Sequence, residues 1–215
     1  MSTTESTIKG ALARVIAGQN LTVAEAEEVF GHLMDGRLGE AVTGGFLTAL
    51  ATKGESAEEI AGAAAAMRQR LVPIPGRWDK LVDTCGTGGD GQGTFNISTA
   101  AAIVASAAGV PVAKHGNRSV SSRSGSADVL EALGVPIEVD PNRAAEVLDQ
   151  IGISFLFAPR LHPAMRQVMP VRHALGVRTI FNILGPLSNP AGARRQVLGV
   201  YEDRLVPLLA EVLRE

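Results

Sequence analysis

The sequence predicts an α/β fold in which a small N-terminal helical domain precedes a larger domain with a central parallel sheet. Three observations support this fold class. Helix-capping patterns mark residues 1–72, short apolar runs alternate with helical stretches from Lys80 onward, and the segment Val-Pro-Ile-Pro-Gly at 72–76 interrupts both patterns. Alternating strands and helices favour a parallel sheet with helices on its faces. We therefore expect a helical domain over 1–72 and an α/β domain over 78–215.

Two capping boxes mark helix starts in the N-terminal domain. Thr22 and Glu25 have the spacing that such a box requires, and so do Ser56 and Glu59. Further along, the stretch 163–180 is helical in pattern and rich in Arg and His. We expect this stretch to join the helical domain, which would make that domain discontinuous.

Short apolar runs define the expected sheet of the second domain. The strand candidates are residues 81–84, 110–113, 136–139, 153–157 and 196–200. The clearest helix candidate covers 141–150, with Asp140 as N-cap, Pro141 in the first position and Gly152 at the exit. Ligands on parallel sheets bind at the carboxyl ends of the strands. The loops after the first, second and fourth runs are therefore the candidate site.

Composition limits the classes of partner and compartment. A formal net charge of -2 argues against general binding of nucleic acid or membrane surfaces. The single cysteine, Cys85, excludes an internal disulfide and fits a reducing compartment. We interpret it as a small buried residue, not a nucleophile. The sequence has neither a signal-peptide pattern nor an apolar run long enough to span a bilayer, so we expect a cytoplasmic protein.

The first candidate loop, residues 86–99, is dense in glycine. Its glycines satisfy a dinucleotide-binding G-x-G-x-x-G pattern, but they continue to Gly93, and the following helix opens only near Ser98. The end of the next strand offers Lys114 and His115 where a dinucleotide site needs an acidic residue. A glycine-rich loop before a helix N-terminus instead indicates an anion site built from backbone N–H groups.

The second candidate loop, residues 114–128, interleaves cations, hydroxyls and glycines with almost no apolar residue. Lysine, hydroxyl donors and backbone amides together are typical of a phosphate-binding loop. Both loops follow strands of one sheet, so they can converge on a single polyanion. We therefore predict a ligand that carries a pyrophosphate.

Six short runs resemble the signature sequences of anthranilate phosphoribosyltransferases. They are Gly-Thr-Gly-Gly-Asp at 86–90, Asn-Ile-Ser-Thr at 96–99, Lys-His-Gly-Asn-Arg at 114–118, Ser-Gly-Ser-Ala-Asp at 124–128, His-Pro-Ala-Met at 162–165 and Arg-Thr-Ile-Phe-Asn-Ile-Leu-Gly-Pro-Leu at 178–187. They occur in the family's order and spacing over nearly the whole chain. The resemblance implies transfer of phosphoribose from phosphoribosyl pyrophosphate (PRPP) to the amine of anthranilate, a step of tryptophan biosynthesis.

The resemblance also implies the residues of each subsite. PRPP would contact Gly86, Gly89, Asp90, Thr94, Asn96, Ile97, Ser98, Thr99, Lys114, His115, Gly116, Asn117, Arg118, Ser119, Val120, Ser121, Ser122 and Ser126. Anthranilate would contact Gly86, Asn117, His115, His162 and Arg172, with Arg172 pairing with its carboxylate. Ser98 would ligate a Mg²⁺ ion, and a homodimer is implied. No catalytic residue is assigned, because an aromatic amine is already a nucleophile.

The family's chains continue beyond position 215 and include a later Asp-Glu pair that binds metal ions. The chain is therefore expected to be a C-terminally truncated form with weakened Mg²⁺ binding, because hard cations need oxygen ligands. Two alternatives stay open. One is a relative similar to pyrimidine nucleoside phosphorylases that acts on another ring, and the other is a non-catalytic PRPP-binding module.

Overall fold

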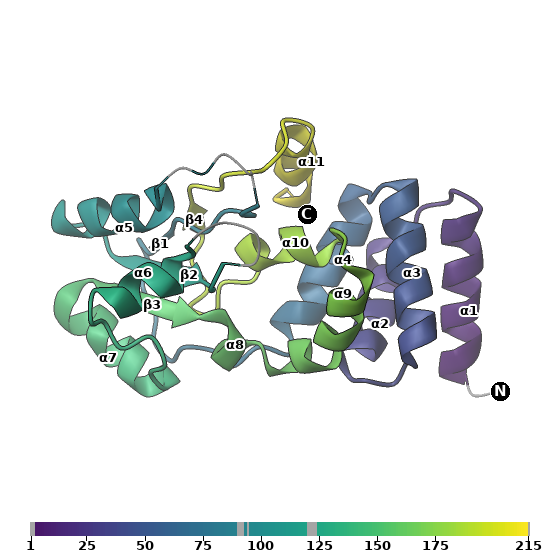
Figure 1. The fold of residues 1–215 in the computed structure, drawn as a ribbon, viewed down its shortest axis with the longest axis horizontal. Coiled ribbons are helices and arrows are strands. Elements are labelled where there is room, and N and C mark those ends of the chain that lie inside the picture. The colour runs from purple at the N-terminus through teal and green to yellow at the C-terminus, as the bar shows by residue number, and fades with distance from the viewer. Residues whose placement is uncertain (1–2, 90–92, 94, 120–123, 215) are drawn as a thin grey trace. The chain divides into compact units, whose positions relative to one another are not determined.

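The computed structural model describes residues 3–89, 93, 95–119 and 124–214 (Figure 1). The chain divides into two compact units. The helical unit comprises Met1–Arg70, Ala164–Leu184 and Arg204–Glu215, and the α/β unit comprises Leu71–Pro163 and Gly185–Asp203. A helical part and a part with a parallel sheet are both present, so the predicted fold class is confirmed.

The helical unit contains seven helices within the described part of the chain. They are α1 (Thr3–Ile16), α2 (Val23–Met34), α3 (Glu40–Lys53), α4 (Ala57–Arg68), α9 (Met169–Leu175), α10 (Phe181–Leu184) and α11 (Leu205–Val212). The 3-10 turn η1 (Pro163–Gln167) precedes α9. The last helix, α11, belongs to this unit, whereas the sequence placed it in the α/β domain.

Both predicted capping boxes are present. Thr22 Oγ1 and Ser56 Oγ accept the backbone N–H groups of Glu25 and Glu59, each at 3.3 Å. The two glutamate carboxylates accept the backbone N–H groups of the cap residues in return, at 2.9 and 2.8 Å. These reciprocal bonds satisfy helix-terminal N–H groups and fix the starts of α2 and α4.

Helices α2 and α4 pack at close range because of a glycine. A Cβ atom on Gly62 would lie 2.4 Å from the carbonyl oxygen of Val23 and 2.7 Å from the Cβ of Ala26. Phe30 of α2 meets Phe181 of α10 edge to face, with ring centroids 5.8 Å apart. The core of the unit therefore depends on a small residue on α4 and on aromatic contacts around it.

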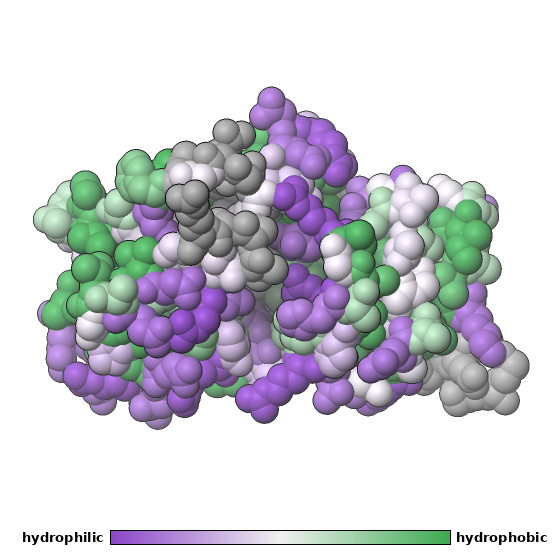
Figure 2. All heavy atoms as spheres, in the orientation of Figure 1, coloured by the Kyte–Doolittle hydropathy of each residue, from purple (hydrophilic) through white to green (hydrophobic). Residues whose placement is uncertain are grey.

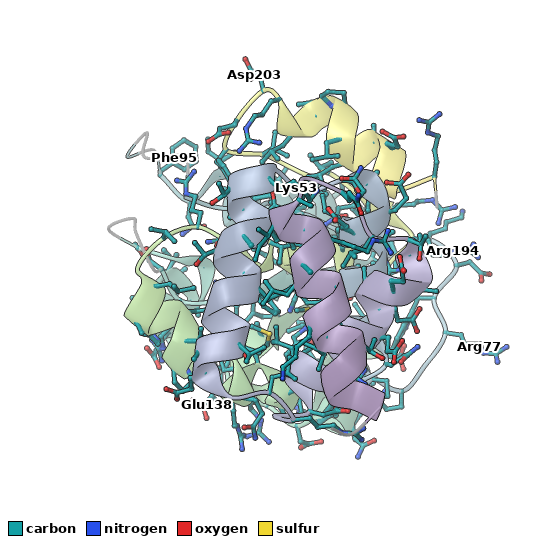
Figure 3. The ribbon with its side chains drawn as sticks, turned by 90° about the vertical axis from the view of Figure 1, so that its right-hand side faces the viewer. Lys53, Arg77, Phe95, Glu138, Arg194 and Asp203 are labelled. Carbon is teal, nitrogen blue, oxygen red and sulfur yellow. The ribbon has the colours of Figure 1, made fainter. Side chains whose placement is uncertain are left out.

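A fully buried carboxylate links three parts of the helical unit. Glu59 accepts hydrogen bonds from the backbone N–H groups of Leu21 and Ser56 and from Lys53 Nζ, at 3.0, 2.8 and 2.9 Å. Lys53 lies at the end of α3 (Figure 3). A buried charge is tolerated only with such partners, so Glu59 joins the end of α3 to the start of α4 and to the segment before α2.

The α/β unit is built on four parallel strands, described as β1 (Val82–Asp83), β2 (Val112–Gly116), β3 (Ile153–Phe157) and β4 (Arg195–Gln196). Their order in the sheet is β3-β2-β1-β4, and every pair is parallel. The helical elements are α5 (Ile97–Ala107), α6 (Ser126–Ala132), α7 (Pro141–Ile151), α8 (Ala158–Leu161) and the 3-10 turn η2 (Gly185–Leu187). The strands β1 and β2 are neighbours, which places their carboxyl ends side by side.

One strand prediction is wrong, and three others have the wrong bounds. The predicted strand at 81–84 is reduced to Val82–Asp83, and the one at 110–113 is found at Val112–Gly116. Residues 136–139 form no strand; the segment is an extended connection in which Ile137 packs into the core with Leu130 and Phe155. An apolar run can serve core packing without pairing in a sheet, and periodicity alone does not separate the two cases. The predicted strand at 196–200 is reduced to Arg195–Gln196.

The start and end of α7 agree with the prediction. Asp140 accepts the backbone N–H groups of Asn142 and Arg143 at 3.0 Å each, and Pro141 occupies the first helical turn. Gly152 ends the helix in the left-handed conformation, with a φ of 77°. The strand β3 follows at once.

The outer face of α5 is apolar and exposed. Ile97, Ile103 and Val104 are 54%, 48% and 69% exposed. Figure 2 shows hydrophobic side chains gathered over this helix. No helix in the described ranges is both long and apolar enough to cross a membrane.

Candidate functional site: two loops at the ends of β1 and β2

The first loop leaves β1 and makes a close backbone contact. A Cβ atom on Gly86 would lie 2.7 Å from the carbonyl oxygen of Gly199, so only glycine fits without displacing backbone. The N–H of Thr87 donates to the same carbonyl at 2.9 Å, and Thr87 Oγ1 accepts the N–H of Tyr201 at 3.1 Å. Gly89 has a φ of 72°, in the left-handed region. These contacts fix the start of the loop against the segment after β4.

Asn96 connects the two loops where α5 begins. Its side chain does not cap α5; Nδ2 donates to the carbonyl oxygen of Ser124 at 3.3 Å, and Oδ1 accepts from Ser126 Oγ at 3.4 Å. Thr99 Oγ1 also donates to Oδ1, at 2.9 Å. The expected convergence of the loops is confirmed at this residue. Beside it, Phe95 points outward and is 74% exposed (Figure 3). Ile97 is 54% exposed.

Lys114 lies buried between the ends of both strands. Its Nζ donates to Ser98 Oγ at 3.1 Å and to Thr84 Oγ1 at 3.3 Å. Thr84 Oγ1 in turn donates to the backbone carbonyl of Ser98 at 2.8 Å. Burial lowers the pKa of the Lys114 ammonium, and the carboxylate of Asp83 opposes that effect. An ammonium group and two hydroxyls therefore meet beside the start of α5, where the helix dipole is positive, and this chemistry suits an anion.

Sequence reasoning missed Asp83, which holds the two strand ends in place. Its Oδ1 accepts the backbone N–H groups of Cys85 and His115, at 3.0 and 3.1 Å. Its Oδ2 accepts Asn189 Nδ2 at 2.8 Å, and the same amide donates to the carbonyl of Ala113 at 2.9 Å. Desolvation raises the pKa of Asp83. The only available signal was an acidic residue inside an apolar run at 81–84.

His115 and His162 form a buried pair. Their Nε2 atoms lie 3.1 Å apart, and His115 Nδ1 lies 3.1 Å from the carbonyl oxygen of Gly185. Burial lowers the pKa of His115 to about 3 and that of His162 to about 4, so both rings are neutral at pH 7. The carbonyl can only accept, which assigns the proton of His115 to Nδ1 and the shared proton to His162 Nε2. His162 Nδ1 is then a bare acceptor, with no hydrogen-bond partner within the described part of the chain.

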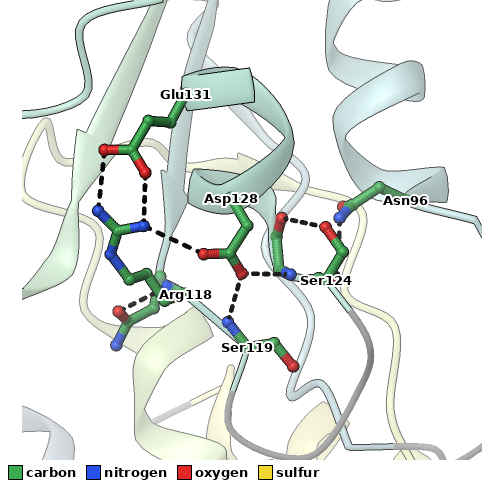
Figure 4. Close-up of polar contacts among 8 residues, drawn as sticks. Asn96, Arg118, Ser119, Ser124, Asp128 and Glu131 are labelled. Carbon is green, nitrogen blue, oxygen red and sulfur yellow. Dashed lines mark hydrogen bonds and ion pairs between the residues drawn. The ribbon is translucent and has the colours of Figure 1, made fainter. Parts of the chain in front are cut away.

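The conformation of the second loop depends on a glycine at its start and on the acidic residues that pair with Arg118. A Cβ atom on Gly116 would lie 2.7 Å from the Phe155 ring, so the strand end needs a glycine there. Asn117 is exposed, and its Oδ1 accepts the N–H of Arg118 at 2.7 Å. The Arg118 guanidinium pairs with Asp128 and Glu131 (Figure 4). Arg118 was expected to contact a phosphate, but two carboxylates already engage its charge.

Five further expected site residues are outside the described residues: Asp90, Thr94, Val120, Ser121 and Ser122.

Arg172 belongs to the helical unit and is partly buried. Burial lowers the pKa of its guanidinium. Its guanidinium carbon lies 5.6 Å from the ring centre of Phe181, and Nη1 lies 3.8 Å from Met169 Sδ. No carboxylate in the described ranges pairs with Arg172, so this guanidinium can accept an acidic ligand.

The residues at the start of α5 could hold a Mg²⁺ ion only together with the phosphate oxygens of a bound ligand. Ser98 Oγ is the one hydroxyl at the α5 terminus that the sequence assigned to metal, and it already accepts from Lys114. Mg²⁺ commonly takes one or two protein ligands, with phosphate oxygens and water completing the set. A second cluster, Asp83, Cys85 and His115, brings its ligand atoms within 4.8 Å of one another. It does not suit a metal, because Asp83 is engaged by N–H donors and burial raises the pKa of the Cys85 thiol to about 12.

A helical-bundle unit together with a parallel α/β unit defines the class of two-domain proteins to which the chain belongs. The chain belongs to the glycosyl transferase family: the model of its helical bundle domain matches residues 9–71, and that of its a/b domain matches residues 78–215.

Named relatives agree with this assignment. The chain is 59% identical over 206 residues to the anthranilate phosphoribosyltransferase of Anaeromyxobacter sp. (strain K), covering 96% of this chain and 61% of that protein. The crystal structure of the Thermus thermophilus enzyme has a TM-score of 0.90 at 51% identity, covering 95% of this chain and 62% of that one. The Saccharomyces cerevisiae enzyme in complex with PRPP and Mg has a TM-score of 0.89 at 31% identity, covering 97% and 62%. A further structure of the Saccharomyces cerevisiae enzyme, in complex with 4-fluoroanthranilate, has a TM-score of 0.84 at 30% identity. The match covers 97% of this chain and 60% of that one. The chain thus spans about three fifths of the length of these relatives.

Proposed function

We propose that the protein to which this chain belongs transfers phosphoribose from PRPP to anthranilate in tryptophan biosynthesis, and that this chain supplies most of the PRPP site. The observation that carries the proposal is the meeting of the two loops, where Asn96 bridges to Ser124 and Ser126 beside the Lys114 ammonium. Two glycine-rich segments at one sheet edge suit a pyrophosphate better than a single phosphate. The named relatives support the choice of substrates.

We propose the following division of the site. The proposed PRPP contacts are Gly86, Gly89, Asp90, Thr94, Asn96, Ile97, Ser98, Thr99, Lys114, His115, Gly116, Asn117, Ser119, Val120, Ser121, Ser122 and Ser126. Arg118, which the sequence also suggested, is left out of this proposal because Asp128 and Glu131 engage its guanidinium. The anthranilate contacts are Gly86, Asn117, His115, His162 and Arg172. Two observations support the second set. Arg172 is a guanidinium without a carboxylate partner in the described ranges, and the bare Nδ1 of His162 can accept a hydrogen bond from an amine.

The reaction needs charge stabilisation more than proton transfer. The amine lone pair forms a bond to C1 of the ribose, the C1–O bond breaks, and its electron pair leaves with pyrophosphate while the nitrogen releases one proton. Lys114 and the amides at the start of α5 oppose the negative charge that builds up on the leaving group. A bound Mg²⁺ would neutralise further phosphate charge, with Ser98 as its proposed protein ligand.

We keep three further proposals from the sequence. The cytoplasm is the proposed compartment, because a single cysteine and a biosynthetic reaction fit a reducing environment. A homodimer without nucleic-acid or membrane partners is the proposed assembly. The proposed domain division is a helical domain over 1–72, joined by the helical stretch 163–180, and an α/β domain that begins at residue 78; α11 is assigned to the helical unit.

Calorimetric titration of PRPP into the chain, with and without Mg²⁺, tests the proposal. We expect saturable binding that Mg²⁺ strengthens, followed by loss of anthranilate fluorescence when anthranilate is added. Binding without turnover would favour a non-catalytic PRPP-binding module. Turnover of a nucleoside with phosphate, in place of anthranilate, would favour the phosphorylase-like alternative. Absence of PRPP binding by a folded chain would refute the site.

A further inference from the structure

One carboxylate oxygen ties the second loop together. Asp128 Oδ2 accepts the backbone N–H groups of Gly125 and Ser119, at 2.7 and 3.0 Å (Figure 4). These two amides stand on either side of residues 120–123 in the sequence. One acceptor therefore fixes the distance between the two ends of the loop.

The same two ends touch at a point where no side chain fits. A Cβ atom on Gly125 would lie 2.3 Å from the backbone nitrogen of Ser119 and 2.6 Å from the carbonyl carbon of Arg118. The neighbouring carbonyl of Ser124 accepts from Asn96 Nδ2 at 3.3 Å. The loop is thus closed by Asp128 and attached to the start of α5 by Asn96.

The charge of this closure needs compensation. Asp128 and Glu131 place two carboxylates beside a loop that we propose binds a polyanion. Arg118 Nη1 donates to Asp128 Oδ1 at 3.2 Å, and its Nη1 and Nη2 donate to both Glu131 oxygens at 2.7 and 3.0 Å. The guanidinium also lies over the Phe157 ring, 5.8 Å from its centre. The planar guanidinium of Arg118 thus uses its donor groups to bind two carboxylates.

We propose, on the basis of the proposed function, that Asp128 is a positioning residue for the PRPP site. By holding the amides of Ser119 and Gly125, it fixes the backbone next to Ser124 and Ser126, where Asn96 joins the second loop to the start of α5. Arg118 neutralises Asp128 and Glu131 in this arrangement and does not contact the phosphates. We name the set of Asp128, Arg118, Glu131 and the amides of Ser119 and Gly125 the clasp.

The two possible roles of Arg118 predict different effects of Asp128→Ala. If Arg118 were a phosphate ligand, this change would remove one of its two carboxylate partners and leave it paired with Glu131, so PRPP binding would be unchanged or tighter. If the clasp positions the loop, PRPP binding weakens by about tenfold, a size expected when a charge-assisted acceptor of two amides is lost. Asp128→Asn keeps an oxygen acceptor and should recover most of the affinity.

A charge-matched series separates neutralisation from direct contact. Arg118→Met alone leaves two carboxylates uncompensated and should weaken PRPP binding by roughly tenfold, through repulsion at partly solvated range. The triple variant Arg118→Met, Asp128→Asn, Glu131→Gln removes every charge of the clasp and should return the affinity to within about threefold of the parent. An affinity that stays tenfold weak in the triple variant would overturn the proposal.

The matched control is Arg143→Met, which removes an exposed arginine paired with Glu146 at 2.9 Å on α7 of the same unit. It should leave PRPP binding unchanged. Hydrogen exchange of the parent without ligand gives a readout independent of PRPP. The amides of Ser119 and Gly125 should be protected, and Asp128→Ala should remove that protection while the thermal midpoint shows a folded chain. If the parent does not bind PRPP, the proposed function fails, and unprotected amides would then overturn the clasp as well.

Discussion

Lys114 illustrates how a single buried charge can be set for a ligand. Its ammonium contacts hydroxyl oxygens of Thr84 and Ser98, and Asp83 offsets part of its charge. Hydroxyls compensate a buried ammonium only partly, so an anionic ligand gains affinity from this group.

We expect Lys114→Met to weaken PRPP binding at least tenfold, because the change removes the charge while keeping most of the side-chain volume. Calorimetry measures the effect. Lys80→Met, which removes an exposed lysine just before β1, serves as the control and should bind as the parent does. Equal affinities for the two variants would show that Lys114 has no role in phosphate binding.

Individual residues show which parts of the candidate site the sequence could suggest and which it could not. The glycines, Lys114 and Ser98 could be proposed as candidates from their residue types alone, because phosphate-binding loops contain such residues in a dense local pattern. Asp83 could not, because its partners, the amides of Cys85 and His115 and the side chain of Asn189, come from three separate segments. The carboxylate partners of Arg118 were likewise hidden by the assumption that an arginine in such a loop faces phosphate.

At the level of elements, local signals predicted helix ends better than strands. Capping boxes at Thr22 and Ser56 act within four residues, and so does the Asp140 cap. A strand exists only if another segment pairs with it, which is why 136–139 looked like a strand and is not one. The two-residue strands β1 and β4 have the same cause: pairing partners, and not composition, set their lengths.

The crossing of α2 and α4 gives a prediction at this scale. Gly62→Ala should destabilise the chain by about 2–3 kcal/mol, because the added Cβ would meet backbone that cannot easily move. Urea unfolding measures the free energy. Gly10→Ala in α1 meets nothing within 4 Å and should stabilise the chain by about 0.5–1 kcal/mol through helix propensity. A neutral result for Gly62→Ala would show that the two helices separate at little cost.

At the level of the whole molecule, the buried histidine pair makes stability depend on pH. The pKa values of His115 and His162 in the folded chain, about 3 and about 4, lie below the ordinary value of 6.5. Between pH 6.5 and pH 4 these histidines bind protons in the unfolded chain but not in the folded chain. The stability that is present above pH 6.5 is therefore lost as the pH falls toward 4.

We therefore expect the free energy of unfolding to fall between pH 7 and pH 5. Each histidine contributes up to about 1.4 kcal/mol for every pH unit below 6.5. His162→Gln should show a shallower decline than the parent in urea unfolding at pH 7, 6 and 5. Identical slopes for the parent and His162→Gln would refute the titration of this pair.

Cys85 gives the protein a practical advantage for labelling. It is the only cysteine of the chain, and burial raises the pKa of its thiol to about 12. Maleimide reagents attack the thiolate, so the native thiol stays nearly inert at neutral pH. Cysteines introduced at exposed positions, such as Arg37→Cys in the helical unit and Arg77→Cys in the α/β unit, would then take dyes selectively. A donor and an acceptor dye could report distances between the units during PRPP titration, with the native cysteine left in place.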